Sequence, residues 1–195
     1  MVTPRLLAPV GAVLVLLGRA SAALAQVHWD AGAQVGVMKR FTTGGAADAP
    51  SPGFGPALEL QGHVALLPML RLGGYLGTDL SPLDGGDAGG PRTFWDGGLH
   101  LRLSPPLLPY PWRTWVYAGF GYAFAYDLGT HLSGGLLEAP VGLGLGRKLT
   151  REWTVFTELG ARFGFGFYGG MYDAAGAPGK DPVALSLSVG LSLEE

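Results

Sequence analysis

The chain of 195 residues contains no cysteine, and its formal net charge at pH 7 is only −2. Without thiols the protein can form neither disulfides nor a thiolate metal site, so packing and backbone pairing must hold the fold. The small negative charge argues against nucleic acid as a partner. Beyond the N-terminal region the sequence has no run of about 18 consecutive apolar residues, which argues against a helical membrane protein. Glycine is abundant, at 34 residues, but lacks the triplet period of collagen.

The first 25 residues follow the pattern of a secretory signal peptide. Arg5 supplies a positive charge, residues 6–17 are apolar, and Ala23-Leu24-Ala25 is a small-x-small cleavage motif. The apolar run is too short to cross about 30 Å of hydrocarbon as a helix. We therefore expect cleavage near Ala25, with residues 20–22 as a second possible site. Residues 26–195 are then expected to form one domain.

The final segment of the chain alternates between two kinds of side chain. From Val183 to Leu193 every second residue is Val or Leu, and the residues between them are Ala, Ser or Gly. Successive side chains of a strand point to opposite faces. One face of this segment suits lipid, and the other is small enough to line a crowded interior.

Eight segments of this kind predict eight strands. Most of them reach the 9–11 residues or so that cross a bilayer at a tilt. The connections are tight at Pro68 and Thr150 but longer on the other side, which is the outer-membrane arrangement. The predicted fold is therefore all-β, an eight-stranded antiparallel up-and-down transmembrane β-barrel with both termini on the periplasmic side. The predicted strands are 27–40, 54–67, 69–80, 92–104, 112–126, 135–149, 151–168 and 182–193.

Aromatic residues lie near the ends of the predicted strands, where barrels in lipid carry two interfacial girdles facing outward. The predicted periplasmic girdle consists of Trp29, Trp112 and Trp153. The predicted outer girdle consists of Phe41, Phe54, Trp95, Tyr126 and Phe167.

This architecture resembles the small eight-stranded outer-membrane barrels, such as OmpX and the membrane domain of OmpA, over nearly all of the mature chain. The resemblance implies export to the outer membrane of a Gram-negative-type bacterium and contact with outer-membrane lipids. It also implies assembly by periplasmic chaperones and the barrel-assembly machinery, and we expect a monomer. The sequence departs from this family at its end, where Leu193 is followed by Glu194-Glu195 and not by an aromatic residue.

The inward face of the predicted strands holds nearly balanced charges. The interior of an eight-stranded barrel is just wide enough to be filled by side chains. Because an unpaired buried charge is costly, we expect these groups to pair and plug the lumen. The functional alternative is a proton or ion path. The expected lumen residues are Asp30, Glu59, Arg71, Asp79, Asp96, Arg102, Arg113, Glu138, Lys148, Glu158 and Arg162.

Three histidines share this inward parity toward the periplasmic side: His28, His63 and His100. Three imidazoles can bind zinc, but their spacing matches no ligand motif, and hydrogen bonding within the plug is favoured. The Gly-x-Gly-x-Gly run at residues 142–146 resembles a phosphate loop only superficially, because no helix pattern follows it. We therefore predict no metal and no cofactor.

The segment His131-Leu132-Ser133 suggests an enzyme hypothesis. The outer-membrane lipid A deacylase PagL has the same fold class and uses a His-x-Ser pair, and a Ser nucleophile with a His base could hydrolyse an ester. The surrounding pattern of PagL is missing, and Glu138 has the inward parity. We expect a polar loop without catalytic activity.

The sequence thus favours a non-enzymatic outer-membrane barrel with a structural or envelope-maintenance role. The alternatives are a narrow channel or carrier for small molecules, as in OmpW-like barrels, and a rim-located lipid hydrolase. A secreted soluble barrel of lipocalin type would enclose a ligand, but the charged inward set argues against an apolar cavity. Fold alone does not determine which of these roles applies.

Overall fold

The computed structural model describes residues 28–43, 53–82, 91–173 and 180–195. The expected signal peptide and the central parts of three expected outer loops lie outside these residues. Within them no helix has the length and apolar character needed to cross a membrane. The strands are β1 (Trp29–Thr43), β2 (Phe54–Leu67), β3 (Leu70–Ser81), β4 (Arg92–Leu103), β5 (Trp112–Asp127), β6 (Ser133–Lys148), β7 (Trp153–Tyr168) and β8 (Lys180–Glu194).

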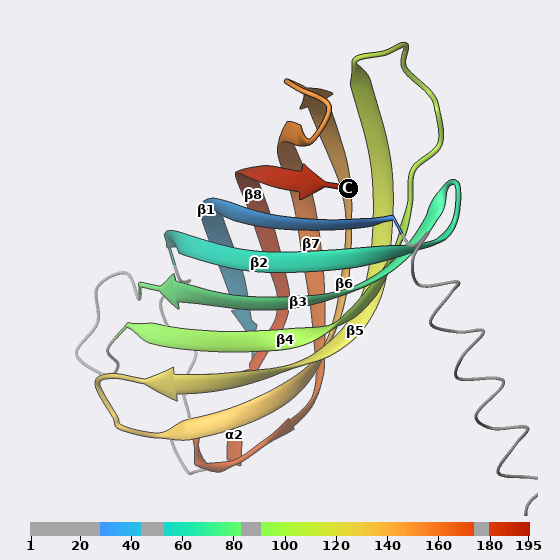
Figure 1. The fold of residues 1–195 in the computed structure, drawn as a ribbon. Helices are drawn as coiled ribbons and strands as arrows, with labels where there is room; N and C mark the ends of the chain where they lie inside the picture. Colours follow the sequence, from blue (N-terminus) through green and yellow to red (C-terminus); the bar gives the residue numbers. More distant parts are fainter. Residues whose placement is uncertain (1–27, 44–52, 83–90, 174–179) are drawn as a thin grey trace, which may run out of the picture.

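The eight strands form a closed barrel in which each strand pairs antiparallel with its neighbours in sequence (Figure 1). β8 closes the barrel by pairing with β1, in a register that runs from Asp30 opposite Glu194 to Phe41 opposite Val183. The predicted eight-stranded up-and-down fold is confirmed. Closure gives every strand two partners, so the barrel has no free edge.

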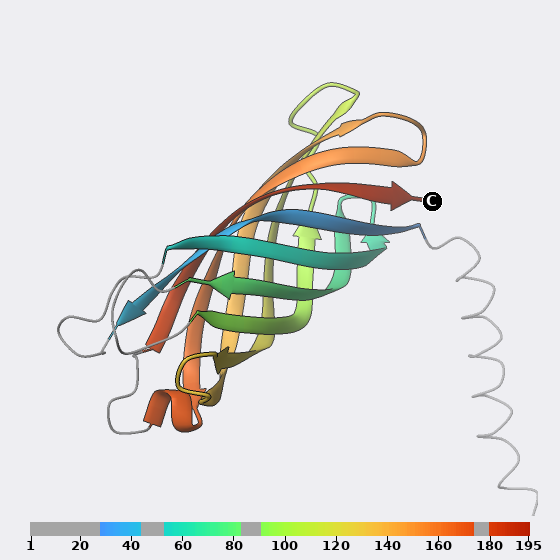
Figure 2. The ribbon, with the colours of Figure 1, turned by 90° about the vertical axis from the view of Figure 1, so that its left-hand side faces the viewer.

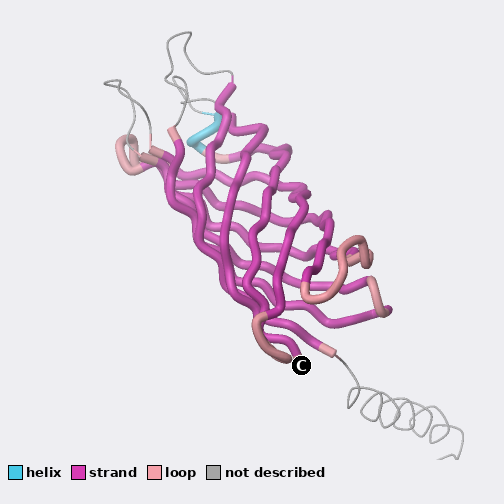
Figure 3. The backbone as a smooth tube through the Cα atoms, turned by 90° about the horizontal axis from the view of Figure 1, so that it is seen from above, coloured by secondary structure: helices cyan, strands magenta, loops and turns pink. Residues whose placement is uncertain are grey.

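The two ends of the barrel differ. Figure 2 shows the C-terminus at one end and the short helix α2 (Gly170–Asp173) at the opposite end, and Figure 3 shows the same arrangement from above. At the C-terminal end the Glu195 amide donates a hydrogen bond to the Trp29 carbonyl at 3.0 Å. The tight β2–β3 and β6–β7 turns lie at this end, which we therefore assign to the periplasmic side.

The outer wall of the barrel is apolar. The outward residues in the middle of the strands are large hydrophobic side chains, many of them about half exposed. A soluble monomer rarely exposes a contiguous apolar surface of this extent, so this wall faces lipid, and the soluble lipocalin-type alternative is wrong. Wall residues include Val35, Val37, Leu58, Leu60, Leu76, Leu99, Leu101, Val116, Phe120, Leu143, Leu159, Leu185, Leu187, Val189 and Leu191.

One expected girdle residue has the opposite orientation. Phe167 faces inward and packs edge-on against Tyr172, with ring centroids 5.1 Å apart. The cause is an irregularity near Gly166, whose φ is +61°, where the register of β7 against β6 shifts. An extra residue in a strand reverses the facing of all that follow. Tyr168 takes the outward position and stacks on Tyr122, with ring centroids 6.0 Å apart.

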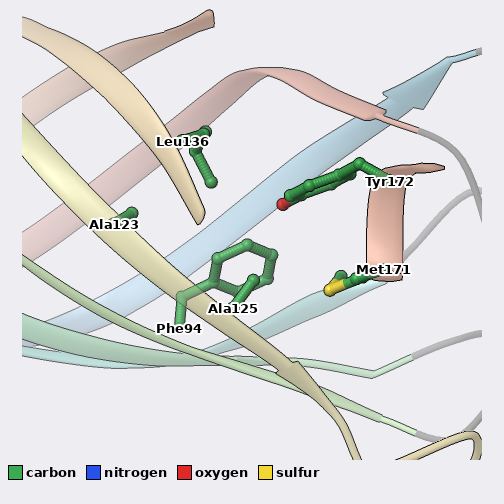
Figure 4. Packing of buried hydrophobic residues seen from close by; sticks show 6 residues of the cluster. All are labelled: Phe94, Ala123, Ala125, Leu136, Met171 and Tyr172. Atoms are coloured by element: carbon green, nitrogen blue, oxygen red, sulfur yellow. The ribbon is translucent and has the colours of Figure 1, made fainter. Parts of the chain in front are cut away.

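An apolar cluster that the alternation did not predict lies at the outer mouth of the barrel. α2 places Met171 and Tyr172 over the barrel interior, where they meet inward residues of β4, β5 and β6 (Figure 4). The predicted strands 151–168 and 182–193 leave this region as a connection, and α2 forms part of it. The strand residues of the cluster are Phe94, Ala123, Ala125 and Leu136.

Candidate functional site: the charged lumen

The outermost level of the charged network centres on Arg40, which is 1% exposed. Its Nη2 donates to Asp79 at 2.7 Å and its Nε donates to the other Asp79 oxygen at 3.1 Å. Its Nη1 donates to Glu138 at 2.8 Å. The guanidinium also lies 3.6 Å from the centroid of the Phe94 ring. Arg40 thus joins β1 to β3 and β6 directly beneath the apolar cluster.

The middle level centres on Arg162 of β7. It donates to Glu59 of β2 at 2.6 Å and to Glu138 of β6 at 3.3 Å, and it forms an ion pair with Asp96 of β4. Glu138 is shared with Arg40. The two guanidinium groups are therefore linked through one carboxylate. Arg162 and Glu138 lie on the adjacent strands β7 and β6, whereas the contacts of Arg162 with Glu59 and Asp96 cross the lumen between strands that are not neighbours.

Uncharged groups connect this level to the next one. The side-chain amide of Gln34 donates to Glu59 at 2.7 Å and to Glu158 at 3.0 Å, and its oxygen accepts from Ser188 at 2.5 Å. The Trp115 indole also donates to Glu158, at 2.7 Å. These contacts satisfy the buried carboxylate of Glu158 and the partly buried carboxylate of Glu59, which would otherwise carry a desolvation cost.

The third level contains Arg102, Asp30 and Arg71. Arg102 donates to Gln61 at 2.9 Å and to Glu158 at 3.4 Å, and its Nη1 lies 3.6 Å from Asp30. Arg71 forms an ion pair with the other Asp30 oxygen. One buried carboxylate is therefore bound by two guanidinium groups from different strands.

Two of the three inward histidines meet at this level. The His63 ring hydrogen-bonds Asp30 through Nδ1 at 2.6 Å and stacks on His100, with ring centroids 4.6 Å apart. His28 is exposed, and its ring contacts the Glu195 carbonyl at 3.2 Å. The idea that the three imidazoles converge is therefore wrong. The described residues hold no cluster of three or more metal-ligating side chains.

The periplasmic mouth has a separate ion-pair group. Arg113 lies 2.7 Å from each carboxylate oxygen of Glu194, and Lys148 lies 3.1 Å from the same carboxylate. Glu194, which follows Leu193 where the family usually has a terminal aromatic residue, is thus the counter-charge for both Arg113 and Lys148. This contact gives the acidic C-terminus a structural role.

Several lumen residues were missed by the sequence analysis. Arg40 has the same parity as Gln34 and lies at the end of the predicted first strand, so alternation alone could have found it. Arg92 and Asp127 are 3.5 Å apart near the outer mouth. Asp127 also accepts hydrogen bonds from the amides of Gly129 and Thr130, which form the turn after β5. A contact within a turn leaves no alternating pattern in the sequence, so period-two alternation could not have predicted it.

The suggested His-x-Ser pair does not form a catalytic arrangement. The His131 ring shares a hydrogen bond with the Tyr126 hydroxyl at 3.0 Å, and no hydrogen bond among the described residues joins it to a carboxylate. His131 also has a φ of 57°. Ser133 is exposed at the first position of β6, and Glu138 points into the lumen.

The chain has the fold of known outer-membrane barrels. No protein-family model and no curated protein matches the sequence. The structure is similar to Neisserial surface protein A, with 11% identity, 85% of this chain and 96% of that chain covered, and a TM-score of 0.62. It is also similar to a major outer membrane protein of Thermus thermophilus, with 17% identity, coverage of 87% and 99%, and a TM-score of 0.56.

A third similar structure is Ail, the attachment invasion locus protein of Yersinia pestis. It is 8% identical, with coverage of 86% and 98% and a TM-score of 0.53. These likenesses concern the fold, and the fold they share is the eight-stranded outer-membrane barrel. The resemblance in fold expected from the sequence is confirmed: the protein has the fold of an eight-stranded outer-membrane β-barrel.

Proposed function

We propose that this outer-membrane barrel is a non-enzymatic protein with a structural or envelope-maintenance role and that its lumen is closed to solutes. The observation that carries the proposal is the Arg40–Glu138–Arg162 chain of ion pairs. Its Arg40–Glu138 link joins the non-neighbouring strands β1 and β6, and its Arg162 also pairs across the barrel with Asp96 of β4. A small barrel whose interior is filled by paired side chains leaves no free path for a solute. Separation of any one pair would leave a buried charge uncompensated. This energetic cost favours the paired arrangement, in which the lumen is closed.

The distribution of cavities also supports a closed lumen and argues against the alternative function, a narrow channel or carrier. The cavity at the periplasmic mouth and the one beside Gln34 and Glu59 have no lining residue in common. The second has a volume of about 30 Å³, which is about the share of one water molecule in the liquid. A carrier or channel for organic molecules needs a wider space at this level.

The proposal includes the lipid environment and assembly of the protein. Outer-membrane lipids contact the apolar wall, and periplasmic chaperones with the barrel-assembly machinery deliver and insert the chain as a monomer. The wall is regular around the whole barrel, and lipid can cover it without a second copy.

Two experiments test this function. Liposomes that contain the purified protein should re-swell in small sugars no faster than protein-free liposomes, whereas a general porin serves as the positive control. Deletion of the gene should increase entry of a hydrophobic dye into cells, and a plasmid copy should restore the barrier. Rapid swelling, or a deletion strain with an unchanged barrier, would contradict the proposal.

A further inference from the structure

A cavity of about 240 Å³ opens at the periplasmic mouth, between the ion-pair network and the turns that join the strands. At about 30 Å³ per water molecule, it could hold roughly eight waters. Its walls include the guanidinium groups of Arg71, Arg102 and Arg113, and the only carboxylate among its lining residues is Glu194. The cavity is thus a concave, cationic space in a barrel whose deeper lumen is filled.

The three arginines differ in how far they are committed to other partners. The side chains of Arg71 and Arg113 are 18% and 38% exposed, so their guanidinium groups remain accessible from the mouth. Arg102 is 9% exposed, and its Nε has no hydrogen-bond partner among the described residues. A buried donor without a partner is costly, and an anion in the cavity is the kind of group that removes this cost.

Two buried hydroxyl groups lie in the same walls, and one of them, that of Thr154, donates to Glu194 at 3.5 Å. Thr154 and Ser192 line the cavity and are 2% and 8% exposed. Guanidinium groups match the geometry of phosphate oxygens, and hydroxyl groups can donate to the oxygens that remain. We propose that this cavity binds a phosphate group, either as a free anion or monoester from the periplasm or as the headgroup phosphate of a lipid. The volume leaves room for an organic substituent beside the phosphate.

Titration calorimetry with inorganic phosphate tests the proposal. The full mature chain is refolded in a maltoside detergent, which contains no phosphate, and sodium chloride of matched ionic strength is the reference. We expect saturable phosphate binding that weakens about tenfold or more in Arg113→Gln and in Arg71→Gln, because each loses a charge-assisted contact. Arg151→Gln, which removes the same charge from the β6–β7 turn outside the cavity, should bind within about twofold of the wild type.

Glu194→Gln provides a change of opposite sign. It removes the one carboxylate that lines the cavity among the described residues and frees Arg113, so phosphate should bind several-fold more tightly. Heat-modifiable gel mobility shows which variants are folded, and the prediction for Glu194→Gln stands even if Arg71→Gln fails to fold. If these residues had only a structural role, no substitution among them would increase the affinity for phosphate.

A second arm distinguishes the two sources of the phosphate. If a lipid headgroup occupies the cavity, binding of inorganic phosphate seen in maltoside should be lost in phospholipid nanodiscs. If a soluble phosphate is the ligand, binding should persist in both. Absence of saturable binding in maltoside, or an equal loss in Arg151→Gln and Arg113→Gln, would overturn the proposal.

Discussion

Arg40 and Asp79 form a two-point ion pair inside the barrel, with hydrogen bonds of 2.7 and 3.1 Å between side chains that are almost fully buried. The pair joins β1 to β3 across the intervening β2. A guanidinium and a carboxylate in this parallel geometry give both charge and directional complementarity. Arg40 also lies against the Phe94 ring of the apolar cluster, so the pair connects this cluster to the ionic network below it.

Replacement of Arg40 by methionine should destabilise the barrel strongly. Arg40→Met leaves Asp79 and Glu138 without their shared cation, and breaking a buried pair typically costs about 3–5 kcal/mol. Urea-dependent unfolding in detergent micelles measures the loss. Lys39→Met is the matched control, since Lys39 lies 5.6 and 5.4 Å from the rings of Phe41 and Phe54 and should cost less than about 1 kcal/mol. Similar losses in the two variants would show that the pair contributes little.

Leu187→Arg should destabilise the barrel through the lipid-facing wall. Leu187 is 55% exposed in the middle of β8, and an arginine near the bilayer midplane costs about 2–4 kcal/mol, against about 0–1 near the interface. Leu149→Arg, in the β6–β7 turn, is the control at the interface. Refolding titrations into lipid vesicles provide the measurement, and a larger effect at Leu149 would mean that the bilayer lies elsewhere on the barrel.

Two glycine substitutions should have opposite effects. A Cβ on Gly144 would overlap the Trp115 ring, so Gly144→Ala should cost about 1–3 kcal/mol through overpacking. A Cβ on Gly62 meets only the Asp30 carbonyl, at 3.7 Å, so Gly62→Ala should stabilise the strand by up to about 1 kcal/mol. Chemical denaturation of both variants tests this contrast, which would be refuted by equal changes of the same sign.

The protein should show no lipid hydrolase activity. His131 is bonded to Tyr126, and no carboxylate of the described chain orients it, so Ser133 keeps the low nucleophilicity of a free hydroxyl. Purified protein in detergent should release no fatty acid from phospholipid or lipid A. Release that disappears in both Ser133→Ala and His131→Ala would make the enzyme hypothesis the leading one.

Much of this fold could be predicted because period-two alternation reports the facing of each residue directly. The same rule failed at Phe167, since the irregularity at Gly166 is a property of the backbone and leaves the alternation of Phe163, Phe165 and Phe167 intact in the sequence. Inward parity also placed Asp30 and Arg162 in the lumen, but it could not pair them. Pairing depends on which strands face each other across the barrel, and that follows from closure and register. His28 shows this limit, because shared parity with His63 did not bring the two together.

The apolar cluster at the outer mouth was beyond sequence reasoning for a related reason. Met171 and Tyr172 belong to a connection whose single helical turn is too short to show a period. Their contacts with Phe94 and Leu136 join residues that are far apart in the sequence. Only the three-dimensional structure reveals these contacts.

Single-channel recording in planar lipid bilayers tests the central claim most directly. The refolded wild-type protein, verified by heat-modifiable mobility, should insert without producing stable current steps in about 1 M KCl, because we propose that the lumen is closed by the Arg40–Glu138–Arg162 chain and its partners. The buried pairs are screened little by salt, so closure should persist at this ionic strength. A large and stable single-channel conductance from folded wild-type protein would contradict the closed lumen and the structural role built on it.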